Sequence, residues 1–119
     1  MSILSIKNIS KFYTLDGKHQ EQALKNINLQ IAKGKITAIY GPSGCGKTSL
    51  LNIISGLDRQ YEGDLEFKGE SLRDLSEIEL TQFRKDKIGF VFQNFNLIPH
   101  QSVLDNVKLP LYVKDLSDR

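Results

Sequence analysis

Residues 41–48 read Gly41-Pro42-Ser43-Gly44-Cys45-Gly46-Lys47-Thr48, which matches the pattern G-x-x-x-x-G-K-[ST]. Glycines in such an octet let the backbone wind closely around a polyphosphate, so that successive N–H groups point at its oxygens. The amine of Lys47 can then reach the β- and γ-phosphates, and the hydroxyl of Thr48 can ligate Mg²⁺. The competing interpretation is a glycine-rich left-handed turn that only joins a strand to a helix.

The segments on either side of the octet favour the phosphate-binding interpretation. Residues 36–40 are β-branched and apolar, which predicts a buried parallel strand. Residues 48–55 are rich in leucine and isoleucine and are followed by Gly56, which predicts a helix that ends at a glycine. The N-terminus of that helix carries a partial positive charge and would face the same anion.

Length and composition restrict the class of protein. The chain has 119 residues, which is one domain at most or part of a larger one. Its formal net charge of +2 is too small to indicate a nucleic acid partner or a membrane surface. Cys45 is the only cysteine, so an internal disulfide is impossible and a reducing compartment is expected. We expect neither a membrane span nor a signal peptide, because the required apolar and basic regions are not found in the sequence.

The remaining sequence predicts a strand-rich first part followed by an α/β part. Expected strands cover residues 3–9, 23–31, 63–68 and 88–92, with turns at Asp16-Gly17, Gly34 and Gly69-Glu70. A helix is expected to begin at the capping box of residues 76–79 and to end near residue 85. Residues 94–101 should form a loop. A short helix should follow from residue 102 to about residue 108, stopped by Pro110.

Forty residues that carry two or more strand patterns precede the octet, whereas small GTPases and nucleotide kinases usually open with the strand that leads into it. In this order the chain resembles the ATP-binding cassette (ABC) family of transporter ATPases, in which an antiparallel β layer comes first. The resemblance covers the whole chain and rests on Lys11-Phe12-Tyr13, Ala23-Leu24-Lys25-Asn26-Ile27, the octet with Ser49-Leu50-Leu51-Asn52-Ile53, and Ile88-Gly89-Phe90-Val91-Phe92-Gln93. Residues 93–99 and 102–107 look most like the lipoprotein- and macrolide-exporter branch, which includes antimicrobial-peptide efflux systems.

The fold implied by the resemblance is α/β: a P-loop NTPase with an antiparallel β layer and an incomplete parallel core sheet with helices. Residues 1–119 would form the N-terminal portion of a single ABC nucleotide-binding domain. We find no counterpart in the sequence of the family's Leu-Ser-Gly-Gly-Gln signature, its second acidic motif or its switch histidine. The chain alone is therefore expected to be inactive in ATP hydrolysis. Because some of its strands would lack neighbours, it is also expected to self-associate.

The resemblance assigns roles to individual residues. Tyr13 would stack on the adenine of ATP. The alternatives are a core aromatic at this position, and Phe12 as the stacking residue. Gln93 would touch Mg²⁺ or the attacking water; the alternative is a polar strand end. The full predicted site comprises catalytic Lys47 and Gln93, metal ligands Thr48 and Gln93, and the nucleotide-binding residues Tyr13, Gly41, Pro42, Ser43, Gly44, Cys45, Gly46, Lys47, Thr48 and Ser49.

Cys45 stands where the family more often has serine. Because it lies beside a helix N-terminus and Lys47, its thiol is expected to be more reactive than a buried one.

Partners and location also follow from the resemblance. The loop at residues 94–101 carries Phe95, Leu97, Ile98 and Pro99, bulky apolar side chains where polar ones are usual. By resemblance this loop meets a transmembrane permease subunit; the alternative is a loop folded onto its own core. A second ABC ATPase subunit would complete a dimer, located in the cytoplasm and peripheral on the inner face of the cell membrane.

An export-coupled ATPase subunit that binds ATP and Mg²⁺ is thus the first interpretation of the sequence. Another P-loop NTPase or kinase, or a non-enzymatic nucleotide-binding or interaction module, is the alternative.

Overall fold

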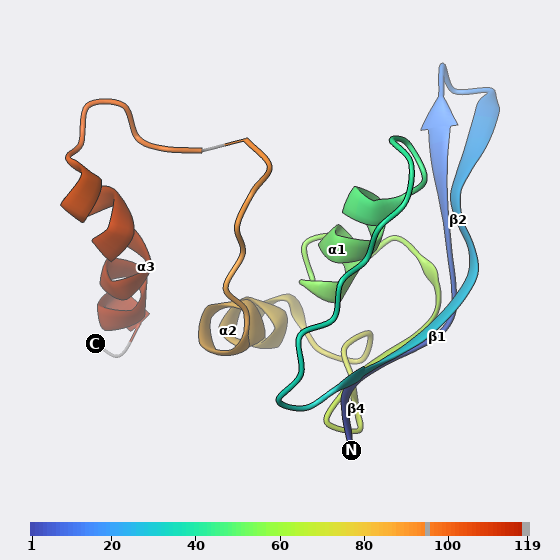
Figure 1. Ribbon diagram of the computed structural model, residues 1–119, viewed down its shortest axis with the longest axis horizontal. Coiled ribbons are helices and arrows are strands. Elements are labelled where there is room, and N and C mark those ends of the chain that lie inside the picture. Colours follow the sequence, from blue (N-terminus) through green and yellow to red (C-terminus); the bar gives the residue numbers. More distant parts are fainter. Residues whose placement is uncertain (95, 118–119) are drawn as a thin grey trace. The chain divides into compact units, whose positions relative to one another are not determined.

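A computed structural model describes residues 1–94 and 96–117, and it divides the chain into two compact units (Figure 1). The first unit is Met1–Leu80 and the second is Thr81–Arg119. The elements in chain order are β1 (Ser2–Leu15), β2 (His19–Ala32), α1 (Lys47–Ile54), β3 (Glu62–Phe67), β4 (Glu70–Ser71), α2 (Glu77–Lys87) and α3 (Val103–Ser117).

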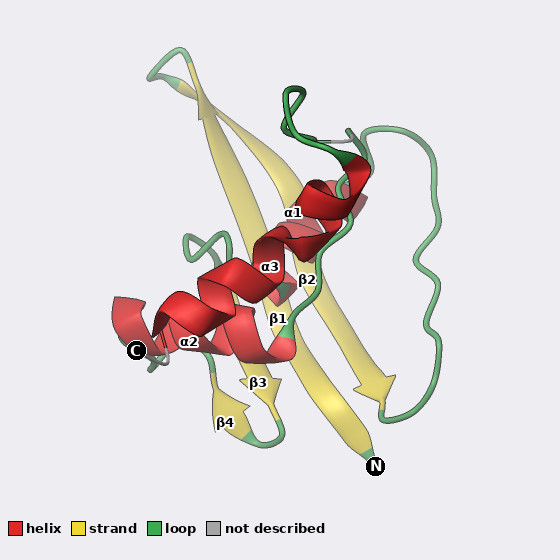
Figure 2. Cartoon of the chain, turned by 90° about the vertical axis from the view of Figure 1, so that its left-hand side faces the viewer, coloured by secondary structure: helices red, strands yellow, loops and turns green. Residues whose placement is uncertain are grey.

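The first unit is built on a four-stranded sheet in the order β2-β1-β3-β4, in which all paired strands are antiparallel (Figure 2). β1 and β2 form a long hairpin whose last pair is Leu15 with His19. The turn between them has positive φ angles at Asp16 (52°) and Gly17 (68°), which an Asp-Gly pair adopts at low cost. The predicted antiparallel layer and this hairpin turn are confirmed.

The core of the first unit lies between the sheet and α1. Ile6, Ile9 and Leu65 from the sheet are almost completely buried, as is Ile53 from α1. α1 has only eight residues, and so short a helix is unstable alone in water. Its stability therefore depends on the apolar face that it buries against the sheet.

The N-terminus of α2 confirms the predicted capping box. The backbone N–H of Ser76 donates to Oε2 of Glu79 at 2.7 Å, and the backbone N–H of Glu79 donates to Oγ of Ser76 at 3.2 Å. The first of these bonds is the larger cause that holds the pKa of Glu79 below its ordinary value. The helix runs two residues beyond the predicted end, to Lys87.

α3 begins as predicted and ends later than predicted. The backbone N–H of Asp105 donates to Oγ of Ser102 at 3.1 Å, so Ser102 caps the N-terminus of the helix. Pro110, however, lies inside the helix, which continues to Ser117. The prediction that Pro110 stops the helix is wrong, because a proline removes one backbone hydrogen bond and can be accommodated by a kink.

Two of the predicted strands are not formed. Residues 36–40 and 88–92 have no strand partner in the described part of the chain, so the predicted parallel strands are absent there. Ile36 and Val91, expected to be buried, are 101% and 96% exposed. A strand forms only where a neighbour supplies hydrogen bonds along its edge. The apolar pattern of these two segments indicates a tendency to be buried, but it does not indicate whether another strand lies beside them to pair with.

Candidate functional site

The glycine-rich octet forms a tight loop that leads directly into α1. Gly44 and Gly46 have φ angles of 79° and 95°, the left-handed region that glycine enters without strain. Gly46 is the N-cap of α1, and no side chain caps this helix end. The first backbone N–H groups of α1 therefore point into the loop and can bind an anion, which the helix dipole also favours.

The loop leaves no room for a side chain at Gly46. A Cβ atom on Gly46 would lie 2.6 Å from the carbonyl oxygen of Ala23 and 2.8 Å from Cδ2 of Leu24, both in β2. A Cβ atom on Gly41 would lie 2.8 Å from Sγ of Cys45. The loop is thus wound closely on itself, as the spacing of its glycines predicts, and it also packs against β2, which the sequence did not indicate.

Lys47 extends back over the loop. Its Nζ atom donates to the carbonyl oxygens of Gly41 at 2.5 Å and of Pro42 at 2.9 Å, and lies 3.6 Å from Sγ of Cys45. One positive charge is thereby held at the centre of the loop, beside the N-terminus of α1. The charge, the uncapped helix end and the glycine winding together fit the terminal phosphates of a nucleotide.

Tyr13 and Ser49, both predicted to contact the nucleotide, are brought together. The Tyr13 hydroxyl oxygen lies 2.9 Å from Oγ of Ser49, within hydrogen-bonding distance. Tyr13 is therefore on the face of β1 that α1 covers, whereas its neighbour Phe12 points to the opposite face because side chains alternate along a strand. This arrangement favours Tyr13 over Phe12 for the predicted base-stacking role.

Gln93 and the predicted docking loop belong to the second unit. Gln93 is exposed, and Thr48, the other predicted metal ligand, is exposed in the first unit. The predicted role of Phe95 lies outside the described residues. A groove of about 270 Å³ in this unit is lined by Leu97, Ile98, Pro99, Gln101, Val103, Asn106 and Val107.

Asn106 holds the loop beside that groove in place. Its Oδ1 accepts from the backbone N–H of Ile98 at 2.8 Å, and its Nδ2 donates to the carbonyl oxygens of Ile98, Gln101 and Ser102. Asn106 is not among the residues predicted from the sequence, because a single asparagine near a helix start gives no signal of such contacts.

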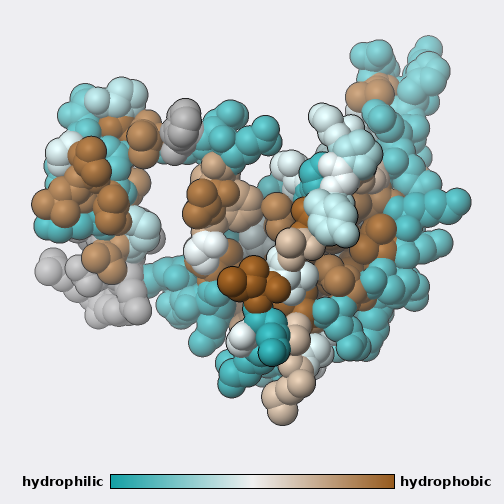
Figure 3. Space-filling view, in the orientation of Figure 1, coloured by the Kyte–Doolittle hydropathy of each residue, from teal (hydrophilic) through white to brown (hydrophobic). Residues whose placement is uncertain are grey.

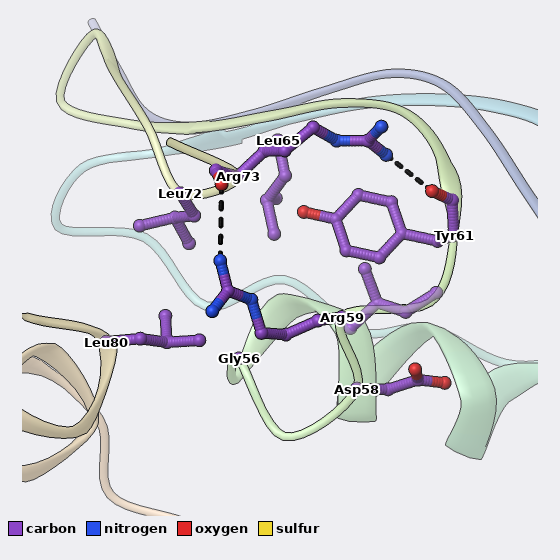
Figure 4. A pocket seen from close by; sticks show the side chains of 9 residues that line it. Gly56, Asp58, Arg59, Tyr61, Leu65, Leu72, Arg73 and Leu80 are labelled. Carbon is purple, nitrogen blue, oxygen red and sulfur yellow. Dashed lines mark hydrogen bonds between the residues drawn. The ribbon is translucent and has the colours of Figure 1, made fainter. Parts of the chain in front are cut away.

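Two other hollows lie in the first unit. A groove of about 370 Å³ beside the octet is lined by Leu24, Ile27, Asn28, Leu29, Ala38, Ile39, Tyr40, Cys45, Gly46, Lys47 and Leu50. A smaller cavity of about 120 Å³ lies at the other end of α1 and is lined by none of the predicted site residues (Figure 4).

The smaller cavity is organised by two arginines. Arg73 donates to the carbonyl oxygen of Tyr61, and Arg59 donates to the carbonyl oxygen of Arg73 at 3.3 Å (Figure 4). Burial raises the pKa of the Tyr61 hydroxyl, and Arg73 partly opposes that rise. Because backbone carbonyls occupy both guanidinium groups, and Arg59 also pairs with the Glu77 carboxylate at 2.7 Å, we assign this cluster to the stability of the fold.

The described residues contain no group of three or more His, Cys, Asp and Glu side chains that could hold a metal ion. Among the same residues, no helix has the length and apolar character needed to cross a membrane.

Comparison with known proteins identifies the family of this chain. The family model described as "ABC transporter" matches residues 24–119. The chain belongs to the ABC transporter family. This confirms the predicted family, and the ATPase cassettes of the family bind ATP or ADP.

Curated relatives of this ABC protein include an uncharacterized ATP-binding protein and two export proteins. It is 48% identical over 112 residues to an uncharacterized ABC transporter ATP-binding protein, MJ0796, of Methanocaldococcus jannaschii, covering 94% of this chain and 47% of that protein. It is 42% identical to the bacitracin export ATP-binding protein BceA of Halalkalibacterium halodurans, covering 95% and 44%. Identity to the macrolide export ATP-binding/permease protein MacB of Rhodopirellula baltica is also 42%, covering 95% and 16%. The chain thus spans less than half the length of each of these relatives.

Solved structures confirm the predicted fold class. The dimeric structure of MJ0796, a bacterial ABC transporter cassette, matches with a TM-score of 0.86 and 49% identity, covering 93% of this chain and 47% of that one. A dimeric post-hydrolysis state of the same cassette, bound to ADP and Pi, matches with a TM-score of 0.85.

Proposed function

We propose that this chain is the N-terminal portion of the nucleotide-binding domain in an ATP-binding subunit of an ABC transporter. The subunit couples ATP binding and hydrolysis to export across a membrane. The observation that carries the proposal is the position of Lys47, whose ammonium lies inside the glycine loop within 2.5 and 2.9 Å of two loop carbonyl oxygens. Identity of 42% to two export ATP-binding proteins supports the direction of transport.

Different residues of the proposed site bind different parts of the nucleotide. The loop amides and Lys47 bind the β- and γ-phosphates, and Ser49 lies at the start of α1 beside them. Thr48 and Gln93 are the proposed ligands of Mg²⁺, which would neutralise phosphate charge. Tyr13 supplies a flat surface for the adenine.

The partners proposed are a transmembrane permease and a second cassette. The apolar groove around Leu97, Ile98 and Pro99 offers a surface to the permease. The dimeric state of the similar MJ0796 cassette supports the second subunit. A location in the cytoplasm, peripheral on the inner face of the membrane, follows from this pairing.

Titration calorimetry with ATP and Mg²⁺ tests the proposal. We expect Lys47→Ala to weaken binding by about tenfold to a hundredfold, because it removes a charge-assisted contact to phosphate. Lys35→Ala, which removes an exposed lysine outside the octet, is the matched control and should bind as the unaltered chain does. Equal binding by both variants would contradict the assignment. We also expect no ATP hydrolysis by this chain, since the sequence offers no acidic motif to activate water.

A further inference from the structure

Lys11 is a buried lysine that is not among the predicted site residues. Its side chain is 5% exposed. The Nζ atom lies 2.9 Å from Oδ2 of Asp58 and donates to the carbonyl oxygen of Gln60 at 2.6 Å. Asp58 and Gln60 belong to the segment between α1 and β3, so this lysine ties the middle of β1 to the chain that leaves α1.

The same ammonium lies over an aromatic ring. The Nζ atom of Lys11 is 5.0 Å from the centroid of the Tyr13 ring, a distance at which the cation attracts the π-face. The hydroxyl of Tyr13 is fixed separately by Ser49, at 2.9 Å. The ring is therefore held at one face through β1 and at its tip by α1.

This arrangement restricts what the Tyr13 ring can bind. One face is occupied by the ammonium of Lys11, which leaves the other face for a flat partner. Tyr13 is 39% exposed, so part of its ring is open to solvent. Lys11 itself is held in place, because its two partners, Asp58 and Gln60, lie on another segment of the chain.

We propose that Lys11 is a positioning residue for nucleobase binding. It acts through Tyr13: the Lys11 ammonium, anchored by Asp58 and Gln60, orders the ring so that its open face can stack on a base. This inference rests on the proposed nucleotide-binding function. It predicts that Lys11 affects the binding of the base and leaves phosphate binding unchanged.

The test compares a ligand that has a base with one that has none. Calorimetry measures binding of ATP and of inorganic tripolyphosphate, each with Mg²⁺, to the chain and its variants. We expect Lys11→Met to weaken ATP binding by about threefold to tenfold, the range for loss of a cation–π contact at a partly exposed site. Tripolyphosphate binding should be unchanged.

Three further variants test whether Lys11 affects ATP binding through the Tyr13 ring. Lys11→Arg keeps a cation over the ring and should restore ATP binding. In a Tyr13→Ala background, Lys11→Met should have no further effect on the ATP-to-tripolyphosphate ratio. Lys7→Met is the matched control, because Lys7 lies on the same strand but forms an exposed pair with Glu66 at 3.5 Å.

The outcomes separate this inference from the function on which it rests. If the unaltered chain binds neither ligand, the proposed function fails and the inference fails with it. If it binds both, and Lys11→Met weakens both equally or neither, only the positioning role of Lys11 is overturned. If Lys11→Met does not fold, Asp58→Asn replaces it, since it removes the anchor and keeps the ammonium; a loss specific to ATP supports the inference and an equal loss refutes it.

Discussion

A Cβ atom on Gly46 would approach the carbonyl oxygen of Ala23 to 2.6 Å, closer than Cβ atoms come to other atoms in proteins. The last glycine of the octet is therefore packed against β2. The shape of the loop depends on this contact as well as on its own sequence.

Gly46→Ala should damage both the loop and the fold. Alanine at a φ of 95° incurs about 1–2 kcal/mol of left-handed strain, and the clash with β2 adds to this. We expect the free energy of unfolding to fall by more than the strain alone and ATP binding to be lost, as measured by denaturant titration and calorimetry. Gly34→Ala is the matched control, because Gly34 has a φ of 71° with nothing within 4 Å of its Cβ position. Equal destabilisation by the two variants would show that the contact with Ala23 is unimportant.

Modification of Cys45 should block the phosphate site. This thiol is exposed, and its Sγ atom lies 3.6 Å from the Lys47 ammonium, so a bulky adduct would occupy the loop. We expect labelling with N-ethylmaleimide to abolish ATP binding. We also expect ATP, when it is added first, to slow the labelling of Cys45, and mass spectrometry measures the labelled fraction over time. Because the chain has one cysteine, a Cys45→Ala variant should take up no label. Unchanged ATP binding after complete labelling would refute the prediction.

Asn106→Leu should release the loop at residues 96–102. The substitution removes four hydrogen bonds to the backbone of Ile98, Gln101 and Ser102. We expect the Ile98 amide to exchange its hydrogen at least about tenfold faster, since its acceptor is lost. Asn94→Leu is the control, because Asn94 is exposed and precedes the loop. Unaltered protection of Ile98 in Asn106→Leu would disprove the clamping role.

The unpaired segment at residues 36–40 should drive self-association. Exposed hydrophobic side chains are visible on the surface, on α3 as well as on the first unit (Figure 3). If association proceeds by strand pairing, Thr37→Pro should weaken it, because proline removes a backbone donor. Ile78→Lys, at an 81% exposed helical position, should have little effect. Sedimentation over a range of concentrations distinguishes these results, and a larger effect of Ile78→Lys would favour simple apolar clustering.

Local signals in the sequence predicted local structure well. The Asp16-Gly17 turn and the Ser76 capping box depend on residues within a few positions of one another, so both can be predicted from the sequence. The octet is similar only in part. Lys47 binds carbonyl oxygens within the octet, whereas Gly46 packs against the distant Ala23 in β2.

Contacts between distant segments could not be predicted in this way. Nothing in the sequence indicates that Lys11 meets Asp58 or that Tyr13 meets Ser49, because these pairs form only when α1 packs on the sheet. The strand patterns at residues 36–40 and 88–92 failed for a related reason. Hydrophobic periodicity reports a preference for burial, whereas a strand also requires a neighbour to pair with.

The central place of β1 in the sheet sets an order for folding. Its pairing with β2 closes a tight turn, but its pairing with β3 joins Leu4 to Phe67 and must close a much longer loop. Long loops carry a larger entropic cost and form later. As the chain leaves the ribosome, we therefore expect the β1–β2 hairpin to appear first, with the nucleotide loop and α1 already synthesised before β3 completes the sheet.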